Sequence, residues 1–279
     1  MRQRWREVGL GMLTLLAVVL SVAAVQPWFR KVLPADAGPI AIAATVLLVY
    51  LVGARWLERR HVSELAPGRA PELAAGLAIG FALFSTVMAL LWALGVYQPA
   101  GWGRAKGIAG AFALAVMAGF VEELLFRGLL YRLSSRIVGT WGALLFTSAL
   151  FGVGHLANKG ATLSSGLAIM LEAGFLLGAA YSLTGRLWLP IGLHIGWNFT
   201  EGSVYGMQIS GQANATGLLR GSLTGSRLLT GGAFGPEGSI VAVLVCLALS
   251  VYLLYRTAQL GRIEPPAWYD AGRPAAVPL

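Results

Sequence analysis

The sequence predicts an all-α, polytopic transmembrane helical bundle of about eight spans. Of its 279 residues, 57% are hydrophobic and only 12% are charged, whereas a soluble domain carries about 25% charged residues. Apolar runs recur along the chain, and each is near the roughly 20 residues that a helix needs to cross about 30 Å of hydrocarbon. Most basic residues lie between these runs, where they orient helices in a membrane.

The first apolar run follows Arg2, Arg4 and Arg6, as a signal peptide would. Because further spans follow it, we interpret it as an uncleaved first helix. The expected spans are 8–25, 38–57, 73–96, 106–125, 141–158, 164–183, 186–204 and 239–256.

The basic residues of the connections predict the orientation of the bundle. With the N-terminus inside, thirteen of them, Arg273 among the last, fall on the cytoplasmic side and seven on the other, with Arg127 set aside. Positive charge favours the cytoplasmic side. We therefore expect both termini to be cytoplasmic.

The spans and connections divide the chain into four segments. The connection 205–238 is rich in Gly, Ser, Thr and Asn, too polar to span, and longer than most connections in compact domains. We expect it to lie over the outer mouth of the bundle. The segments are N-terminal helices with a charged cytoplasmic linker (1–72), a helical catalytic core (73–204), the polar loop (205–238), and the last span with a cytoplasmic tail (239–279).

The sequence supports neither a nucleic-acid partner nor a structural role for cysteine. The net charge of +9 is not arranged as a basic face interleaved with aromatic residues, so no nucleic-acid partner is expected. The single cysteine, Cys246, forms neither an internal disulfide nor a thiolate metal site. The expected surroundings are the lipid bilayer.

Ionisable residues inside apolar spans are costly and usually mark function. The fourth expected span contains Glu122 and Glu123, and Arg127 follows one turn later. Glu123 and Arg127 are four residues apart, which suits an ion pair on one helix face. Glu122 points about 100° away, so the same arginine does not easily reach it. An unpaired carboxylate in apolar surroundings suits a general base, and an interfacial charge cluster is the structural alternative.

Two histidines also lie within apolar spans. If the helix of Glu122 continues to a turn at Gly139, Glu122 lies 17 residues before the turn and His155 lies 16 after it. In an antiparallel hairpin the two side chains then reach the same depth, about 25 Å from the turn at 1.5 Å per residue. His194 and Asn198 share one face of a later helix, where an imidazole and an amide can donate to one oxyanion.

Simpler readings stay open for these polar residues. Either histidine, or the pair of His194 and Asn198, could hydrogen-bond neighbouring helices instead of acting in a reaction. Glu172, in the sixth span, has no motif around it and is a secondary candidate for the site.

Three motifs together resemble those of the CPBP intramembrane protease family, which includes type II CAAX prenyl endopeptidases and proteins like lysostaphin resistance protein A. They are EExxxR at Glu122–Arg127, FxxxH at Phe151–His155 and HxxxN at His194–Asn198, on consecutive apolar spans. Their order and spacing match over about residues 75–204. More loosely, ERRHVSEL (58–65) and GGAFGPEGS (231–239) are similar to family features.

The resemblance implies hydrolysis of a peptide bond within the membrane. Glu122 and His155 would activate a water molecule, and His194 and Asn198 would stabilise the oxyanion. Glu123 and Arg127 would hold their helix in register. The family is commonly labelled as metalloprotease, and Glu122, His155 and His194 could form a His₂Glu zinc site. A glutamate-driven hydrolase without a metal is the alternative, so the cofactor is unknown, with zinc as the candidate.

The resemblance implies a membrane-associated peptide or membrane-protein substrate. The sequence shows no eukaryotic targeting signal, and we expect an integral protein of a bacterial plasma (inner) membrane. Two other functions remain open: a non-catalytic immunity or scaffold protein with the same bundle, and a proton-coupled transporter that uses Glu122, Glu172 and the histidines as a relay.

Overall fold

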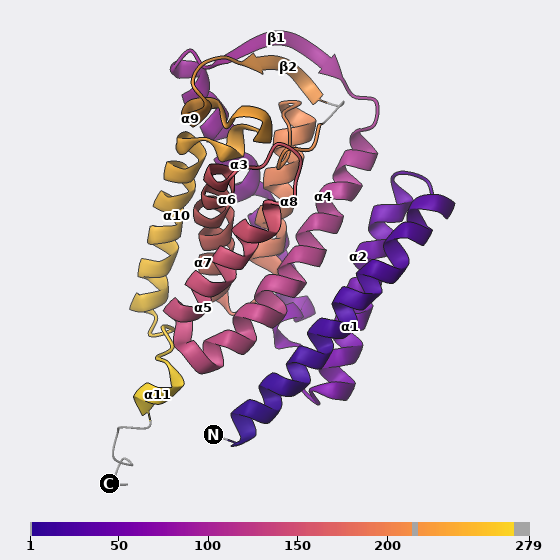
Figure 1. Cartoon of the computed structure of the whole chain (residues 1–279), viewed down its shortest axis with the longest axis vertical. Helices are drawn as coiled ribbons and strands as arrows, with labels where there is room; N and C mark the ends of the chain where they lie inside the picture. Colours follow the sequence, from indigo (N-terminus) through magenta and orange to yellow (C-terminus); the bar gives the residue numbers. More distant parts are fainter. Residues whose placement is uncertain (1, 214–216, 271–279) are drawn as a thin grey trace.

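The computed structural model describes residues 2–213 and 217–270 as a helical bundle with a two-stranded sheet across one end (Figure 1). The helices are α1 (Arg2–Val32), α2 (Ala37–Val52), α3 (Pro71–Ala93), α4 (Ile108–Glu123), α5 (Arg132–His155), α6 (Leu163–Ile169), α7 (Phe175–Thr184), α8 (Trp188–Phe199), α9 (Arg227–Thr230), α10 (Ile240–Gln259) and α11 (Ala267–Asp270). Turns of π-helix are η1 (Gly53–Leu57), η4 (Leu124–Tyr131), η5 (Met170–Gly174) and η6 (Thr200–Val204), and turns of 3₁₀-helix are η2 (Ser63–Leu65), η3 (Pro67–Arg69), η7 (Gly232–Phe234) and η8 (Pro236–Gly238). The strands are β1 (Tyr97–Arg104) and β2 (Gly217–Leu223).

The predicted class, a polytopic helical membrane protein, is confirmed. In the described residues, six helical segments are long and apolar enough to cross a membrane. One of them, Ile108–His155, has 48 residues and reverses its direction at Gly139, where φ is 70° and ψ is −178°. This segment therefore accounts for two of the eight expected runs. The run expected at 186–204 corresponds to α8 and η6, which have 12 and 5 residues and together fall short of the roughly 20 needed to cross the hydrocarbon.

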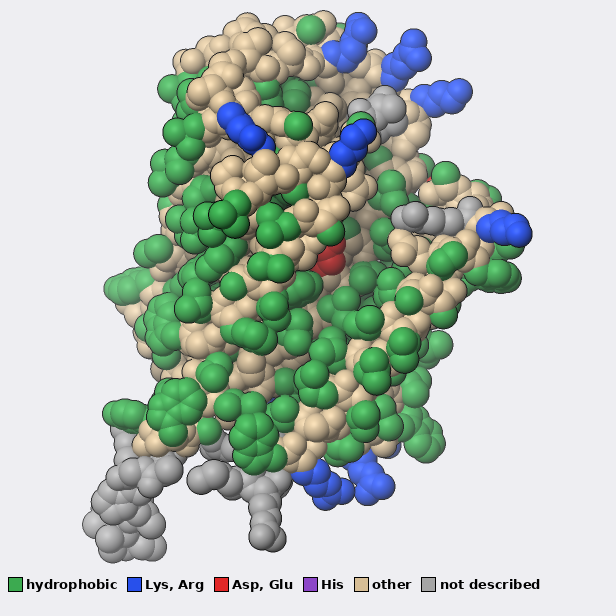
Figure 2. Space-filling view, in the orientation of Figure 1, with side chains coloured by type: hydrophobic (Ala, Val, Ile, Leu, Met, Phe, Trp, Pro, Cys, Tyr) green, Lys and Arg blue, Asp and Glu red, His purple; other side chains and the backbone are tan. Residues whose placement is uncertain are grey.

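The surface of the bundle carries the pattern of a membrane protein. Figure 2 shows a broad hydrophobic band between two ends that bear Lys and Arg side chains. The start of α1 and helix α11 lie at the same end of the bundle (Figure 1). The side of the membrane on which that end lies stays a prediction, and Arg273, which contributes to it, lies outside the described residues.

Helices α3 and α8 pack closely through glycines. A Cβ atom on Gly76 or Gly80 would collide with the α8 backbone, and one on Gly192 or Gly196 would collide with the α3 backbone. Small residues four apart allow such close approach in membranes, where packing replaces the hydrophobic effect as the force between helices. The contact fixes the depth and rotation of α8, and with them the position of His194.

A buried polar network ties the charged linker to the core. Arg60 pairs with Glu58 and Glu64, and Arg132 of α5 pairs with Glu58 at 2.7 Å. Tyr50 of α2 donates to Glu64. Burial opposes ionisation of Glu58, but Arg132 and Arg60 outweigh it and lower the pKa of this carboxyl. The loosely family-like segment 58–65 is thus a structural clamp between α2 and α5.

The small sheet is an addition to the predicted helical architecture. Strand β1 pairs antiparallel with β2, so that Tyr97 lies opposite Leu223 and Arg104 opposite Gly217. The pairing joins the connection after α3 to the long polar loop and covers one end of the bundle (Figure 1). Residues 214–216 of that loop lie outside the described residues.

Candidate functional site

Glu122 and Glu123 end helix α4, where the chain enters the π-helical turn η4. π-Helical turns are rare in proteins, and those that occur are often found at functional sites. Here η4 is followed by continuous helix as far as Gly139, where the chain reverses, as the depth comparison of Glu122 and His155 assumed. The two adjacent carboxylates point in different directions. Glu122 lines a cavity, whereas Glu123 is fully buried behind it.

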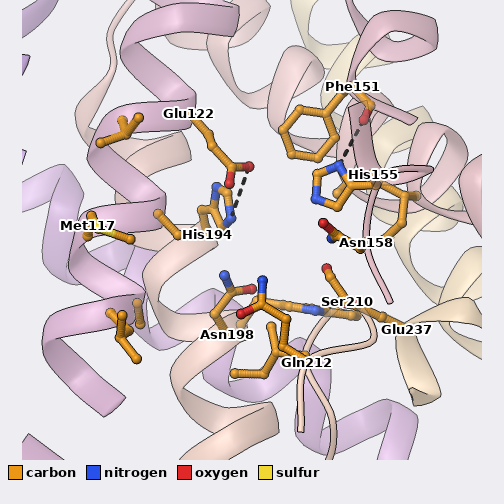
Figure 3. A pocket seen from close by; sticks show the side chains of 18 of the residues that line it. Met117, Glu122, Phe151, His155, Asn158, His194, Asn198, Ser210, Gln212 and Glu237 are labelled. Carbon is orange, nitrogen blue, oxygen red and sulfur yellow. Dashed lines mark hydrogen bonds and ion pairs between the residues drawn. The ribbon is translucent and has the colours of Figure 1, made fainter. Parts of the chain in front are cut away.

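A cavity of about 480 Å³ opens in the middle of the hydrophobic band. Figure 2 shows a hollow there with an acidic side chain at its base. Four residues singled out from the sequence line this one cavity: Glu122 from α4, His155 from α5, and His194 and Asn198 from α8. Glu172, the secondary candidate, also lines it. In Figure 3, Glu122 and His194 lie on one wall, and His155 lies across the cavity from them.

Behind the cavity, a buried chain of charges connects α4 to α8. One oxygen of Glu123, Oε1, accepts from Arg127 at 2.9 Å and from Nδ1 of His194 at 2.9 Å. Glu123 is 0% exposed and Arg127 is 1% exposed. The ion pair expected from the i, i+4 spacing is therefore present, and it also orients the imidazole of His194.

Arg127 additionally links the first motif to the second. Its guanidinium donates to the carbonyl oxygens of Ala173 and Gly174 in η5. It also lies 4.9 Å from the centre of the Phe151 ring, within the range of a cation–π contact. Phe151 is buried and contacts His155 one turn later. The phenylalanine of the FxxxH motif thus packs between the arginine and the histidine.

The hydrogen bonds of the two histidines define their tautomers. Nδ1 of His155 lies 2.8 Å from the carbonyl oxygen of Phe151, which only accepts, so Nδ1 carries a proton. Nδ1 of His194 donates to Glu123 for the same reason. Each ring therefore has its Nε2 atom free for chemistry.

Glu122 lies next to the free nitrogen of His194. Its Oε2 atom is 4.0 Å from Nε2 of His194 (Figure 3). That oxygen is buried and has no hydrogen-bond partner among the described residues. A buried carboxylate oxygen without a partner is unfavourable unless a ligand, a water molecule or a proton reaches it. Glu122 is therefore available to a molecule in the cavity.

The sequence did not single out the polar residues of the remaining wall. Asn158 follows the end of α5, while Ser210 and Gln212 come from the long loop and Glu237 from η8. Figure 3 shows Gln212 beside Asn198, and Asn158, Ser210 and Glu237 on the side of His155. The only available signals were the expected position of the loop over the bundle and the loosely family-like segment that contains Glu237. Neither the loop nor this segment has a hydrophobic periodicity from which the direction of a side chain could be predicted.

A His₂Glu metal site needs its three ligands close together around one point. Among the described residues, no group of three or more His, Cys, Asp or Glu side chains is placed to hold one. Glu122, His155 and His194 share the cavity, but His155 stands across it from the other two. The arrangement as it stands does not fit a His₂Glu zinc site.

The comparisons with known proteins agree with the motifs. Residues 104–200 match the family model described as "Type II CAAX prenyl endopeptidase Rce1-like". No curated protein and no solved structure matches the chain. The matched segment runs from the end of β1 to the start of η6 and contains all three motifs. Residues 104–200 of this chain are therefore similar to the Rce1-like type II CAAX prenyl endopeptidases.

Proposed function

We propose that this protein is an intramembrane endopeptidase that hydrolyses a peptide bond of a membrane-associated peptide or protein. One observation carries the proposal. Glu122 lines a cavity inside the hydrophobic band, its Oε2 atom has no hydrogen-bond partner among the described residues, and two imidazoles line the same cavity.

The first step is the activation of water. A water molecule between Glu122 and His155 donates one hydrogen bond to the carboxylate and one to Nε2 of His155, which accepts because Nδ1 holds the ring proton. Glu122 takes a proton from the water molecule while the water oxygen attacks the carbonyl carbon of the scissile bond. A positioned general base of this kind contributes about 10²–10⁴-fold to the rate.

The second step is the stabilisation of the tetrahedral oxyanion. The side-chain amide of Asn198 can donate to it from the cavity wall. Nε2 of His194 donates as well when the ring carries both protons, with Glu123 accepting from Nδ1. Glu122 then returns its proton to the leaving nitrogen, so that water and the peptide yield a carboxylic acid and an amine.

Glu123 and Arg127 act as positioning residues, because neither lines the cavity. Glu123 orients the His194 imidazole, and Arg127 fixes Glu123, η5 and Phe151 relative to one another. The rigid support lies on three separate helical segments. Preorganised groups of this kind need no rearrangement at the moment of reaction.

A test in cells separates this proposal from a scaffold or immunity role. Membrane peptides from cells that contain the protein, Glu122→Gln or His155→Ala are identified by mass spectrometry. Fragments that depend on both residues support the proposal. Full biological activity of both variants, without such fragments, would favour a non-catalytic protein, and substrate-dependent uptake into proteoliposomes would favour a transporter.

A further inference from the structure

The cavity has a second group of acidic side chains, which the proposed reaction does not use. Glu172 of η5, Glu201 of η6 and Glu237 of η8 are 2%, 0% and 2% exposed. Glu172 and Glu237 line the cavity, whereas Glu201 does not. Glu237 interacts electrostatically with both of the other carboxyls. Three elements thus bring three buried acids together beside the site.

These acids have no Lys or Arg partner in the described part of the chain. No Lys or Arg is among the described residues that line the cavity, and none of the three acids forms an ion pair with a described residue. Apart from a carboxyl–carboxyl contact between Glu201 and Glu237, both oxygens of Glu201 and Oε1 of Glu237 lack a hydrogen-bond partner there. A buried carboxylate without a partner is costly, and it is relieved either by a proton or by a cation.

The surroundings of Glu237 show which of the three is available to a ligand. Ser210 from the loop hydrogen-bonds to its carboxyl and holds it at the cavity wall (Figure 3). Ser210 itself has a φ of 48°, a strained value for a residue other than glycine. Burial raises the pKa of Glu237 and so favours its protonated form. His155 acts on Glu237 through charge, but its Nδ1 atom is committed to Phe151.

We propose that Glu237 is a specificity-determining residue that receives a cationic group of the peptide substrate, a Lys or Arg side chain, on the cavity wall across from Glu122. The inference rests on the proposed function and names the substrate class for that site. An incoming ammonium or guanidinium would replace the proton of Glu237 and bond its unpartnered oxygen. A hydrophobic peptide segment with one basic residue near the scissile bond is the substrate that this cavity selects.

Peptide binding to the Glu122→Gln variant in lipid nanodiscs tests this inference without the need for cleavage. The probes are N-acetylated Leu/Ala peptides of about 20 residues, long enough to span the bilayer, with Lys, norleucine or Glu at one central position. We expect the Lys peptide to bind at least about 10-fold tighter than the norleucine peptide, because a charge-assisted hydrogen bond can supply that difference. The Glu peptide should bind most weakly. A Lys peptide with a free N-terminus shows whether a terminal amine competes for the same site.

Adding Glu237→Gln should bring the Lys and norleucine peptides to within about twofold of each other. Glu201→Gln is the matched control, because it removes a buried carboxyl that does not line the cavity, and the Lys preference should persist. Equal weakening of both peptides by Glu237→Gln would overturn the inference and assign Glu237 to the support of the loop. If that variant does not fold, a norleucine or Glu peptide that binds as tightly as the Lys peptide overturns it.

Cleavage of the same peptides by the unmodified protein reports separately on the proposed function. A Lys preference in binding without any cleavage would remove the endopeptidase and leave the cation site. Cleavage of the Lys and norleucine peptides at equal rates, with no preference in binding, would support the endopeptidase and remove the cation site.

Discussion

The buried pair of Glu123 and Arg127 gives the sharpest test of how the site is held. Replacing Arg127 with Met removes the donor to Glu123 and the donors to two carbonyl oxygens of η5. It leaves a fully buried carboxylate with His194 as its only hydrogen-bond partner among the described residues. Breaking a buried pair on one side costs about 3–5 kcal/mol of unfolding free energy. Glu123→Gln, which keeps an acceptor oxygen, should cost less, about 1–3 kcal/mol.

The double variant isolates the interaction. Because the double variant removes the carboxylate and the guanidinium together, its loss of unfolding free energy should fall short of the sum of the two single losses by at least about 1 kcal/mol. The assay is equilibrium unfolding in mixed micelles. The pair of Arg186 and Glu72 is the matched control, since its side chains are 25% and 22% exposed and such pairs contribute about 1 kcal/mol or less. A coupling at Glu123 and Arg127 no larger than at the control pair would refute the reasoning.

Three further predictions concern other parts of the molecule. Arg132 and Arg60 lower the pKa of Glu58 in the folded state, so the contribution of Glu58 to stability is present above the ordinary pKa of 4.5 and is lost as the pH falls through the lower folded pKa. A pH series of thermal unfolding should show this loss of stability in acid, and the Glu58→Gln variant should show a smaller loss. Gly196→Val places a side chain against the Leu77 carbonyl of α3, and we expect a loss of about 1–3 kcal/mol with slower cleavage, whereas Gly9→Val, where a Cβ atom meets nothing within 4 Å, should change neither; equal effects would count against the close packing. Since the described residues place no three ligands for a metal, cleavage should persist after dialysis against a chelator; a stoichiometric metal whose removal abolishes cleavage would instead assign Glu122, His155 and His194 as its ligands.

Regular helix geometry made part of the site predictable. The rise of 1.5 Å per residue placed Glu122 and His155 at one depth on either side of Gly139, and both line the same cavity. The i, i+4 rule paired Glu123 with Arg127, and those groups lie 2.9 Å apart. Local rules succeed here because the two helical segments are continuous on each side of one turn.

Contacts between distant segments were not predictable in the same way. The pairing of β1 with β2 joins residues more than a hundred positions apart through backbone hydrogen bonds, in segments rich in Gly. Ser210 and Glu237 lie in stretches without periodicity, so no helix face assigns their direction. His194 lies between Glu122 and Glu123, and this follows from the glycine contact of α8 with α3, not from the spacing of any motif.

The central claim is that Glu122 activates water inside the membrane. Its most direct test is the single-turnover cleavage rate of purified Glu122→Gln in proteoliposomes, with the Lys peptide as substrate and with insertion and thermal stability shown to match the unmodified protein. We predict a rate at least about 100-fold lower, the loss of a positioned general base. A rate within about twofold of the unmodified protein would contradict the assignment of Glu122.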